Sequence, residues 1–225
     1  MPTSLAQPAR QARSRLSEAD LRAFAQRGVQ FTVEAFHQLA ASGVLGEEDR
    51  VELLDGHLVT MAPVGPSHLF ATNRLERLFG QRLYAERPFP AHVSVQNPIR
   101  LDDGTEPIPD LVLLRPDTRE DRVPRPEDVL LVVEVAESSA DFDREVKRPR
   151  YAAAGIPEVW LVLPGERVVE VARRPSAAAL ADSVFAEVIR HGEEAQLNVA
   201  ALPDLAPLPV ADMFVPRADT NDDGR

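Results

Sequence analysis

The sequence predicts an α/β domain, because strand-like and helical patterns alternate along most of its 225 residues. One segment, residues 129–135, is nearly all aliphatic, as expected of a central strand that is buried on both faces. Another, residues 67–86, places leucine and phenylalanine on one face of a helix. A hydrophobic content of 44% is ordinary for a globular domain with a full core. We therefore expect one domain, built on a sheet with helices packed against it.

The first elements of this domain are expected to be a short helix and a hairpin. Thr32 is a favourable N-cap for the helix, and Gly43 is placed to end it. Residues 50–61 contain Asp55-Gly56 between two short apolar stretches, which is the pattern of a tight hairpin turn. The long helix over residues 67–86 then follows.

The rest of the pattern predicts five more strands and one more helix. The helix covers residues 141–154 and ends at Gly155, and Pro149 is expected to kink it about one turn after Lys147. Besides the aliphatic strand, strand-like runs occupy residues 92–101, 110–114, 159–163, 168–171 and 185–190.

Three regions are expected along the chain. Residues 1–29 are predicted to be a largely disordered tail with one short helix over residues 18–26, capped by Ser17. Residues 30–214 form the predicted folded domain, and residues 215–225 a disordered acidic tail.

Composition excludes several classes of protein and site. Cysteine is absent, so disulfides and thiolate metal sites are excluded. No apolar run approaches the roughly 18 residues of a membrane span, so a cytoplasmic protein without a membrane partner is expected. The net charge of −11 argues against a broad basic surface for nucleic acid. That objection is limited, since a nuclease site itself gathers carboxylates and local arginines can contact phosphates.

Lys147 is the only lysine among 25 basic residues, and it follows Glu134 by 13 residues. Arginine supplies surface charge as well as lysine does, whereas lysine offers a compact ammonium that suits proton transfer or close approach to a water. The alternatives are chance survival of one lysine and an ordinary helix pair with Asp143, worth about 0.2–0.5 kcal/mol. We interpret the position after an acid-tipped strand as a sign of chemistry.

Two carboxylates precede this lysine at strand ends. Asp110 follows Pro109 at the start of one strand, and Glu134 lies 24 residues later, near the end of the aliphatic strand. Adjacent strands can bring both to one edge of a sheet, where two hard oxygen ligands with room for waters suit Mg²⁺. Such an ion polarises a phosphodiester and lowers the pKa of an attacking water, which Lys147 is placed to orient or activate. Taken singly, Asp110 also fits a turn and Glu134 a solvated strand end.

Three blocks of sequence add a specific resemblance. They are VELLDGHLVTMAPVGP, EPIPDLVLLRP and LLVVEVAESSADFDREVKRPRYAAAGIPEVWLV, in this order. With them the chain resembles the Uma-type restriction endonuclease family of bacteria, part of the PD-(D/E)xK nuclease superfamily, over about residues 30–214. The resemblance implies a mixed β-sheet flanked by helices, with an αβββαβ core. It also implies a metal-dependent endonuclease that uses Mg²⁺, with Mn²⁺ able to substitute.

The resemblance implies a set of metal ligands by position. Asp110 matches the aspartate of the PD pair, and Glu134 matches the acidic position that follows. The carbonyl of Val135 is a further ligand by analogy, and Glu52 matches the early glutamate of the family. Glu52 lies on a strand beside the Asp-Gly turn, so it also fits an ordinary exposed acid.

The resemblance carries one departure from the superfamily pattern. The usual lysine, two residues after the acid, falls at Ala136, and Lys147 of the next helix matches the lysine thought to replace it. Asp143 is a candidate to orient that lysine. Tyr151 is expected to pack the helix on the sheet, and His68, at the start of the long helix, is expected to be structural.

The predicted function is metal-dependent hydrolysis of nucleic-acid phosphodiesters, with DNA the expected substrate and Asp110, Glu134 and Lys147 as catalytic residues. A homodimer is expected, with the apolar face of the long helix and the C-terminal strands as candidate surfaces. Two alternatives remain open. One is a catalytically silent binding or scaffold protein of the same fold, which the acidic charge favours. The other is a hydrolase of a smaller phosphate ester, which would lack the salt-dependent DNA binding of a nuclease.

Overall fold

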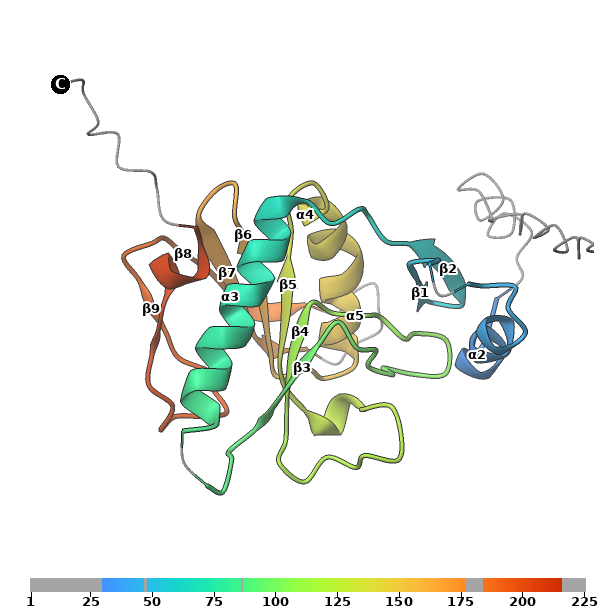
Figure 1. Ribbon diagram of the computed structural model, residues 1–225, viewed down its shortest axis with the longest axis horizontal. Coiled ribbons are helices and arrows are strands. Elements are labelled where there is room, and N and C mark those ends of the chain that lie inside the picture. The colour runs from blue at the N-terminus through green and yellow to red at the C-terminus, as the bar shows by residue number, and fades with distance from the viewer. Residues whose placement is uncertain (1–29, 47, 86, 177–183, 216–225) are drawn as a thin grey trace, which may run out of the picture.

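The computed structural model has the predicted α/β architecture, a mixed sheet with helices on both faces (Figure 1). The helix predicted over residues 18–26 and nearly all of the predicted C-terminal tail lie outside the described part of the chain. The structure describes residues 30–46, 48–85, 87–176 and 184–215.

The main sheet has six strands, whose spatial order equals their order in the chain: β3 (His92–Val95), β4 (Leu111–Leu114), β5 (Val129–Val135), β6 (Glu158–Leu163), β7 (Val168–Pro175) and β8 (Phe185–His191). β5 and β6 are parallel, and the other neighbouring strands are antiparallel. The parallel pair requires a crossover, which the helical segment between β5 and β6 supplies.

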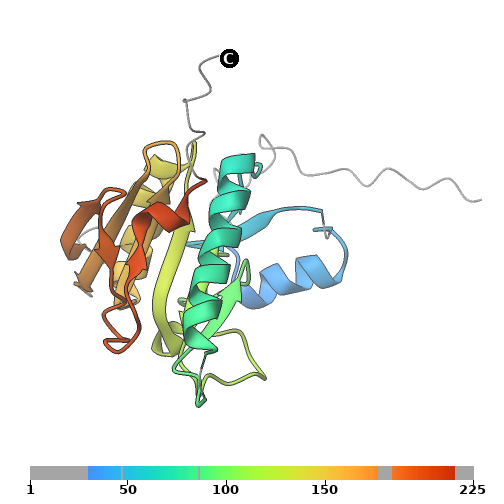
Figure 2. The same ribbon diagram turned by 60° about the vertical axis from the view of Figure 1, so that its left-hand side comes forward.

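The central strand β5 is buried over its whole length, as its aliphatic sequence predicts. On one face of the sheet, α3 (Pro66–Leu83) and the C-terminal segment pack against side chains that include Val133 and Trp160. On the other face, α5 (Arg148–Ala153) packs through Tyr151. Figure 2 shows α3 standing across the sheet with the C-terminal turn beside it.

The long helix α3 buries the apolar face that its spacing predicts. Leu75, Leu78, Phe79 and Leu83 are all buried against the sheet. Pro66 opens the helix, where its missing N–H has no partner to lose. Because the apolar face is covered within the chain, the prediction that it forms a dimer surface is wrong.

The helix predicted over residues 141–154 is irregular. It consists of α4 (Ala140–Phe142), a π-helical turn η2 (Asp143–Lys147) and α5. The amide of Arg148 donates to the carbonyl of Asp143, five residues back. Pro149 has no N–H to donate, and its ring crowds the carbonyl four residues earlier, so a wider turn relieves the strain. The irregularity therefore includes Lys147, one turn earlier than the predicted kink.

Glu170 of β7 anchors this wide turn to the sheet. Its carboxylate accepts hydrogen bonds from Arg144 at 2.8 Å and from Arg148 at 3.2 Å, and these two arginines flank Lys147 in the sequence. Burial would raise the pKa of Glu170, but Arg144, Arg148 and Arg190 outweigh it and hold the pKa below the ordinary 4.5.

The first helix, α2 (Val33–Ala41), has the predicted ends. The hydroxyl oxygen of Thr32 accepts a hydrogen bond from the amide of Ala35 at 3.2 Å. Gly43 follows the helix with a φ of 73°, in the left-handed region that favours glycine.

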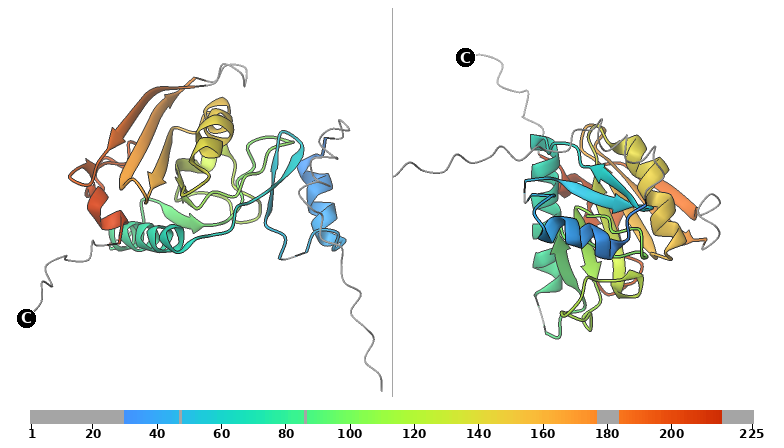
Figure 3. Two further views of the ribbon diagram at one scale, coloured as in Figure 1. Left: turned by 90° about the horizontal axis from the view of Figure 1, so that it is seen from above. Right: turned by 90° about the vertical axis from the view of Figure 1, so that its right-hand side faces the viewer.

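The predicted hairpin is formed by β1 (Val51–Leu54) and β2 (His57–Thr60). Its turn residues Asp55 and Gly56 have φ values of 50° and 76°, as expected of an Asp-Gly turn. The hairpin is tied to the loop before β4, because Gly56 donates to the carbonyl of Gly104 at 2.7 Å. Figure 3 shows α2 and the hairpin together at one side of the main sheet.

Several segments differ from the predictions. The strand expected over residues 92–101 ends at Val95, because Gln96 has a φ of 51° and Pro98 cannot donate to a strand ladder. Segments of two to four residues were too short for a periodic signal. They are η1 (Pro126–Asp128), β9 (Gln196–Leu197), β10 (Leu208–Pro209) and η4 (Val210–Met213). No helix among the described residues has the length and apolar character to cross a membrane.

Alanine substitutions at three glycines distinguish the cost of backbone strain from the cost of a steric clash of the added Cβ. An added Cβ at Gly56, where φ is +76°, would lie 2.7 Å from the Cβ of Gln30, whereas Gly155, with φ of +77°, faces open space. Gly165 has open space and no positive φ. We expect Gly155→Ala to lower the free energy of unfolding by about 1–2 kcal/mol and Gly56→Ala to lower it further. Gly165→Ala should change it by less than about 0.5 kcal/mol. Urea denaturation measures the free energy of unfolding of all three variants. Equal losses in Gly56→Ala and Gly155→Ala would contradict the close packing of Gly56 against Gln30.

The lowered pKa of Glu170 predicts a pH-dependent stability. A folded-state pKa below the unfolded one stabilises the protein above the unfolded pKa, and this stabilisation is lost as the pH falls through the folded pKa. We expect Glu170→Gln to cost about 1–3 kcal/mol at pH 7, with the difference from wild type shrinking as the pH falls below 4.5. Denaturation at pH 7 and in acid tests this. Glu76→Gln, an exposed change on α3, is the control and should show no such pH dependence.

Candidate active site

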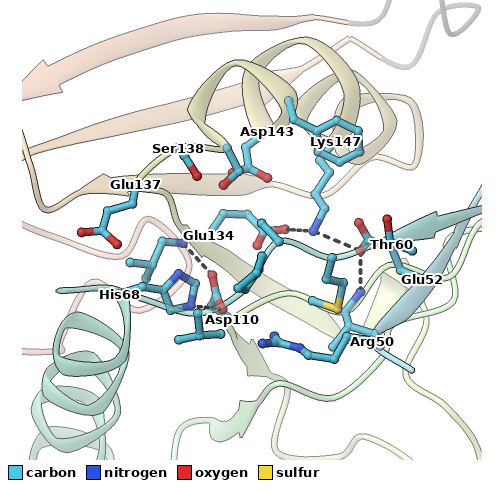
Figure 4. Close-up of a pocket in the computed structure, with 18 of the residues that line it drawn as sticks. Arg50, Glu52, Thr60, His68, Asp110, Glu134, Glu137, Ser138, Asp143 and Lys147 are labelled. Carbon is cyan, nitrogen blue, oxygen red and sulfur yellow. Dashed lines mark hydrogen bonds and ion pairs between the residues drawn. The ribbon is translucent and has the colours of Figure 1, made fainter. Parts of the chain in front are cut away.

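A polar pocket of about 310 Å³ lies where the hairpin, the start of α3, the ends of β4 and β5 and the π-helical turn meet. Residues that are distant in the sequence converge here because β4, which is antiparallel to β5, begins at the edge of the sheet where β5 ends, and the helical crossover to β6 starts at the same edge. Figure 4 shows the polar lining: Arg50, Glu52, Thr60, His68, Asp110, Glu134, Glu137, Ser138, Asp143 and Lys147.

Asp110 and Glu134 lie opposite each other on neighbouring strands. β4 and β5 pair with Leu111 opposite Val133, and continuing this register places Asp110 opposite Glu134. Directly opposite residues of antiparallel strands have Cβ atoms about 4.5–5.5 Å apart. The two carboxylates predicted to act together are therefore side by side, and both are buried.

The carboxylate of Asp110 is held from two directions. Its Oδ2 accepts a hydrogen bond from the amide of Val135 at 2.8 Å, and its Oδ1 is 2.8 Å from Nε2 of His68. Burial tends to lower the pKa of His68, but the adjacent carboxylate of Asp110 outweighs it, so the pKa is raised. His68 is thus a polar partner of Asp110 and not only a residue of the helix start.

Glu134 accepts two hydrogen bonds from the helical segment. Its Oε1 is 2.6 Å from the hydroxyl of Tyr151 and 3.3 Å from Nζ of Lys147. Burial, together with the carboxylates of Asp143 and Asp110, raises the pKa of Glu134 to about 8 in spite of the opposing charge of Lys147. Tyr151 packs the helix on the sheet, as predicted, and also binds Glu134.

Lys147 is buried and bridges two elements. Besides Glu134 of β5, its ammonium lies 3.0 Å from Oε2 of Glu52 in the hairpin. Burial by itself would lower the pKa of Lys147, but the carboxylates of Glu134, Glu52 and Asp143 outweigh it and raise the pKa. The ammonium is therefore charged at neutral pH, so it donates hydrogen bonds and cannot accept a proton.

Glu52 is buried, so the alternative interpretation of this residue as an ordinary exposed acid is wrong. It is only 2% exposed, and its Oε2 accepts hydrogen bonds from the amide of Ile108 at 3.2 Å and from Lys147. A buried carboxylate needs such partners, because an unpaired charge in the interior is costly. The hairpin thus delivers a charged group to the main domain.

Asp143 lies in the same cluster without forming an ion pair to Lys147, so the helix pair considered as an alternative role for this lysine is not formed. Its carboxylate accepts a hydrogen bond from the hydroxyl of Ser139 at 3.1 Å. Burial raises the pKa of Asp143 to about 6. Ser139 precedes α4, but its hydroxyl does not cap that helix. Asp143 acts on Lys147 only through its charge.

The structure brings together the site residues predicted from the sequence, because Asp110, Glu134, Lys147, Glu52 and Val135 all line one pocket. Arg50 and His68 line it too. The GPSH run at the start of α3 was a signal for His68, whereas nothing in the sequence distinguishes Arg50 from the other arginines.

The donor set of the pocket fits a hard divalent cation. Among the described residues, no group of three or more histidine, aspartate or glutamate side chains is arranged to hold a metal, so an all-protein cage of the zinc type is not supported. Mg²⁺ requires only one or two carboxylates and keeps several waters. The pocket is lined by five carboxylates against one lysine and one arginine, which leaves negative charge that a cation would balance.

Comparisons with known proteins identify the family and the fold of this chain. The model of the Uma2 family, described as "Putative restriction endonuclease", matches residues 33–211. A crystal structure described as "a putative nuclease belonging to DUF820", from Anabaena variabilis, has the same fold, with a TM-score of 0.62 and 15% sequence identity. The match covers 82% of this chain and 97% of that chain. No curated protein is significantly similar in sequence. The extent of the family match shows that this chain belongs to the Uma2 family.

Proposed function

We propose that this protein is a Mg²⁺-dependent endonuclease that hydrolyses phosphodiester bonds of nucleic acid, with DNA as the substrate. One observation carries the proposal: Asp110 and Glu134 lie opposite each other on two strands, next to the charged Lys147, in a pocket open to substrate. Family membership supports a nuclease, and the donor set supports the metal. Cleavage within a strand, the choice of DNA and a homodimeric state are our own extensions.

Asp110 and Glu134 are the residues that would hold the metal, with the carbonyl of Val135 beside them. A bound Mg²⁺ would polarise the phosphodiester and lower the pKa of a bound water. The contacts of Glu52 favour a different role from the one implied by the resemblance. Its Oε2 already accepts hydrogen bonds from Ile108 and Lys147, so we assign it to positioning that lysine.

Lys147 acts in this proposal as a hydrogen-bond donor and a fixed positive charge. Its raised pKa favours the role of a hydrogen-bond donor over that of a general base near neutral pH. A buried ammonium next to the reacting phosphate stabilises the negative charge that develops in the transition state, and it does so without reorganisation because Glu52 and Glu134 already hold it. His68 keeps Asp110 oriented toward the pocket.

Cleavage assays test the assigned residues. We expect the wild-type protein with Mg²⁺ or Mn²⁺ to cut plasmid DNA and an internally labelled oligonucleotide. Asp110→Asn should reduce the rate at least about a hundredfold, because a neutral amide does not replace an anionic ligand. Lys147→Arg should reduce the cleavage rate by a similar factor, since the larger guanidinium cannot take the place of the ammonium between Glu52 and Glu134. Circular dichroism establishes that both variants fold.

Asp117→Asn is a matched control, because Asp117 is exposed in the loop after β4 and outside the pocket. Its rate should equal that of wild type. Full activity of Lys147→Arg would remove Lys147 from the mechanism. Hydrolysis of a small phosphodiester such as bis(p-nitrophenyl) phosphate without any DNA cleavage would favour the phosphate-ester alternative, and no hydrolysis and no metal binding would favour a silent binding protein.

Metal binding has its own readout. Any ligand that binds only the folded state raises the thermal midpoint as its concentration passes the dissociation constant. We expect Mn²⁺ and Mg²⁺ to raise the midpoint of the wild-type protein, and Asp110→Asn to abolish the increase. Calorimetric titration measures the stoichiometry. An equal increase in wild type and Asp110→Asn would show that the cation binds elsewhere.

A further inference from the structure

Arg50 is placed at the pocket by a fixed backbone but has no partner for its side chain. It lies directly before β1, and its carbonyl accepts a hydrogen bond from the amide of Met61 at 2.8 Å, across the hairpin. Its side chain is exposed and lines the pocket. Its guanidinium forms no hydrogen bond or ion pair with any described residue.

This free guanidinium is unusual for the surroundings. The chain has 36 acidic residues, and the other arginines near the site are paired, Arg144 and Arg148 with Glu170 and Arg150 with Asp55. Lys147 is occupied by Glu52 and Glu134. Among the described residues that line the pocket, Arg50 is therefore the exposed and unpaired positive charge, whereas Lys147 is a buried and paired one.

The position of Arg50 fits a phosphate that is being cleaved. In Figure 4 its side chain extends beneath Asp110, which lines the same pocket. An anion that approaches the carboxylate pair therefore meets the guanidinium from the hairpin side. The planar guanidinium offers parallel N–H groups that match two oxygens of a phosphate, which the compact ammonium of lysine does not.

We infer that Arg50 binds the phosphodiester of the substrate and holds it against Asp110 and Glu134. This inference rests on the proposed nuclease function and assigns the phosphate contact to the hairpin. In this arrangement the sheet provides the carboxylates of Asp110 and Glu134, and the helical turn provides the buried ammonium of Lys147. The hairpin provides the charge that binds the substrate, on Arg50. It also explains how a chain with a net charge of −11 can take a nucleic acid at one point of its surface.

The test compares four proteins: wild type, Arg50→Ala, Arg50→Lys and Arg77→Ala. Arg77 is a matched control, because it is exposed on α3, forms no side-chain hydrogen bond or ion pair with a described residue and does not line the pocket. The substrate is a labelled 20-base-pair DNA duplex with Mg²⁺, and kcat and KM are measured over a range of salt concentrations. Thermal midpoints should be equal in all four, since neither arginine contributes to packing.

We expect Arg50→Ala to lower kcat/KM by about tenfold or more, mainly through KM, as one charged hydrogen-bonding group is lost. The slope of log kcat/KM against log salt concentration should become shallower by about one, the amount expected for the loss of one phosphate contact. Arg50→Lys should recover part of the loss, and Arg77→Ala should match wild type. If wild type cleaves and Arg50→Ala equals Arg77→Ala, this inference fails while the nuclease function stands. If wild type does not cleave at all, both fail.

Discussion

The ion pairs of Lys147 are the interaction on which the site depends. One ammonium joins Glu52 of the hairpin to Glu134 of the central strand, and the lysine itself comes from the helical segment that crosses between β5 and β6. Three elements are thereby held at one point. Removing the ammonium would leave two carboxylates buried and unpaired, which is costlier than the pair is favourable.

The geometry of Lys147 depends in turn on the backbone around it. The π-helical turn widens the helix where Pro149 cannot continue a regular hydrogen-bond ladder, and Glu170 holds the two flanking arginines on β7. Such turns are rare and are found at functional sites. The strain of the turn is thus compensated by ion pairs outside the pocket.

Charge is the second organising constraint. The pocket gathers more carboxylates than cations, and burial, together with the neighbouring carboxylates, raises the pKa of Glu134 to about 8 and that of Asp143 to about 6. In the proposed mechanism a divalent cation would balance this negative charge, and the guanidinium of Arg50 would bind the phosphate. The net charge of −11 is compatible with the proposed binding of nucleic acid, because the positive charge that would contact the phosphate, on Arg50, lies at the pocket itself.

The sequence by itself determined the elements and the identity of most site residues. The aliphatic strand, the capped helix at Thr32, the Asp-Gly hairpin and the apolar face of the long helix were all readable, since each is set by local periodicity or turn chemistry. The lone lysine and the ordered blocks pointed to Asp110, Glu134 and Lys147. Tertiary structure decided what no local pattern encodes. It alone buried Glu52, turned His68 toward Asp110 and left Arg50 without a partner, because these properties depend on which distant charges meet across the fold.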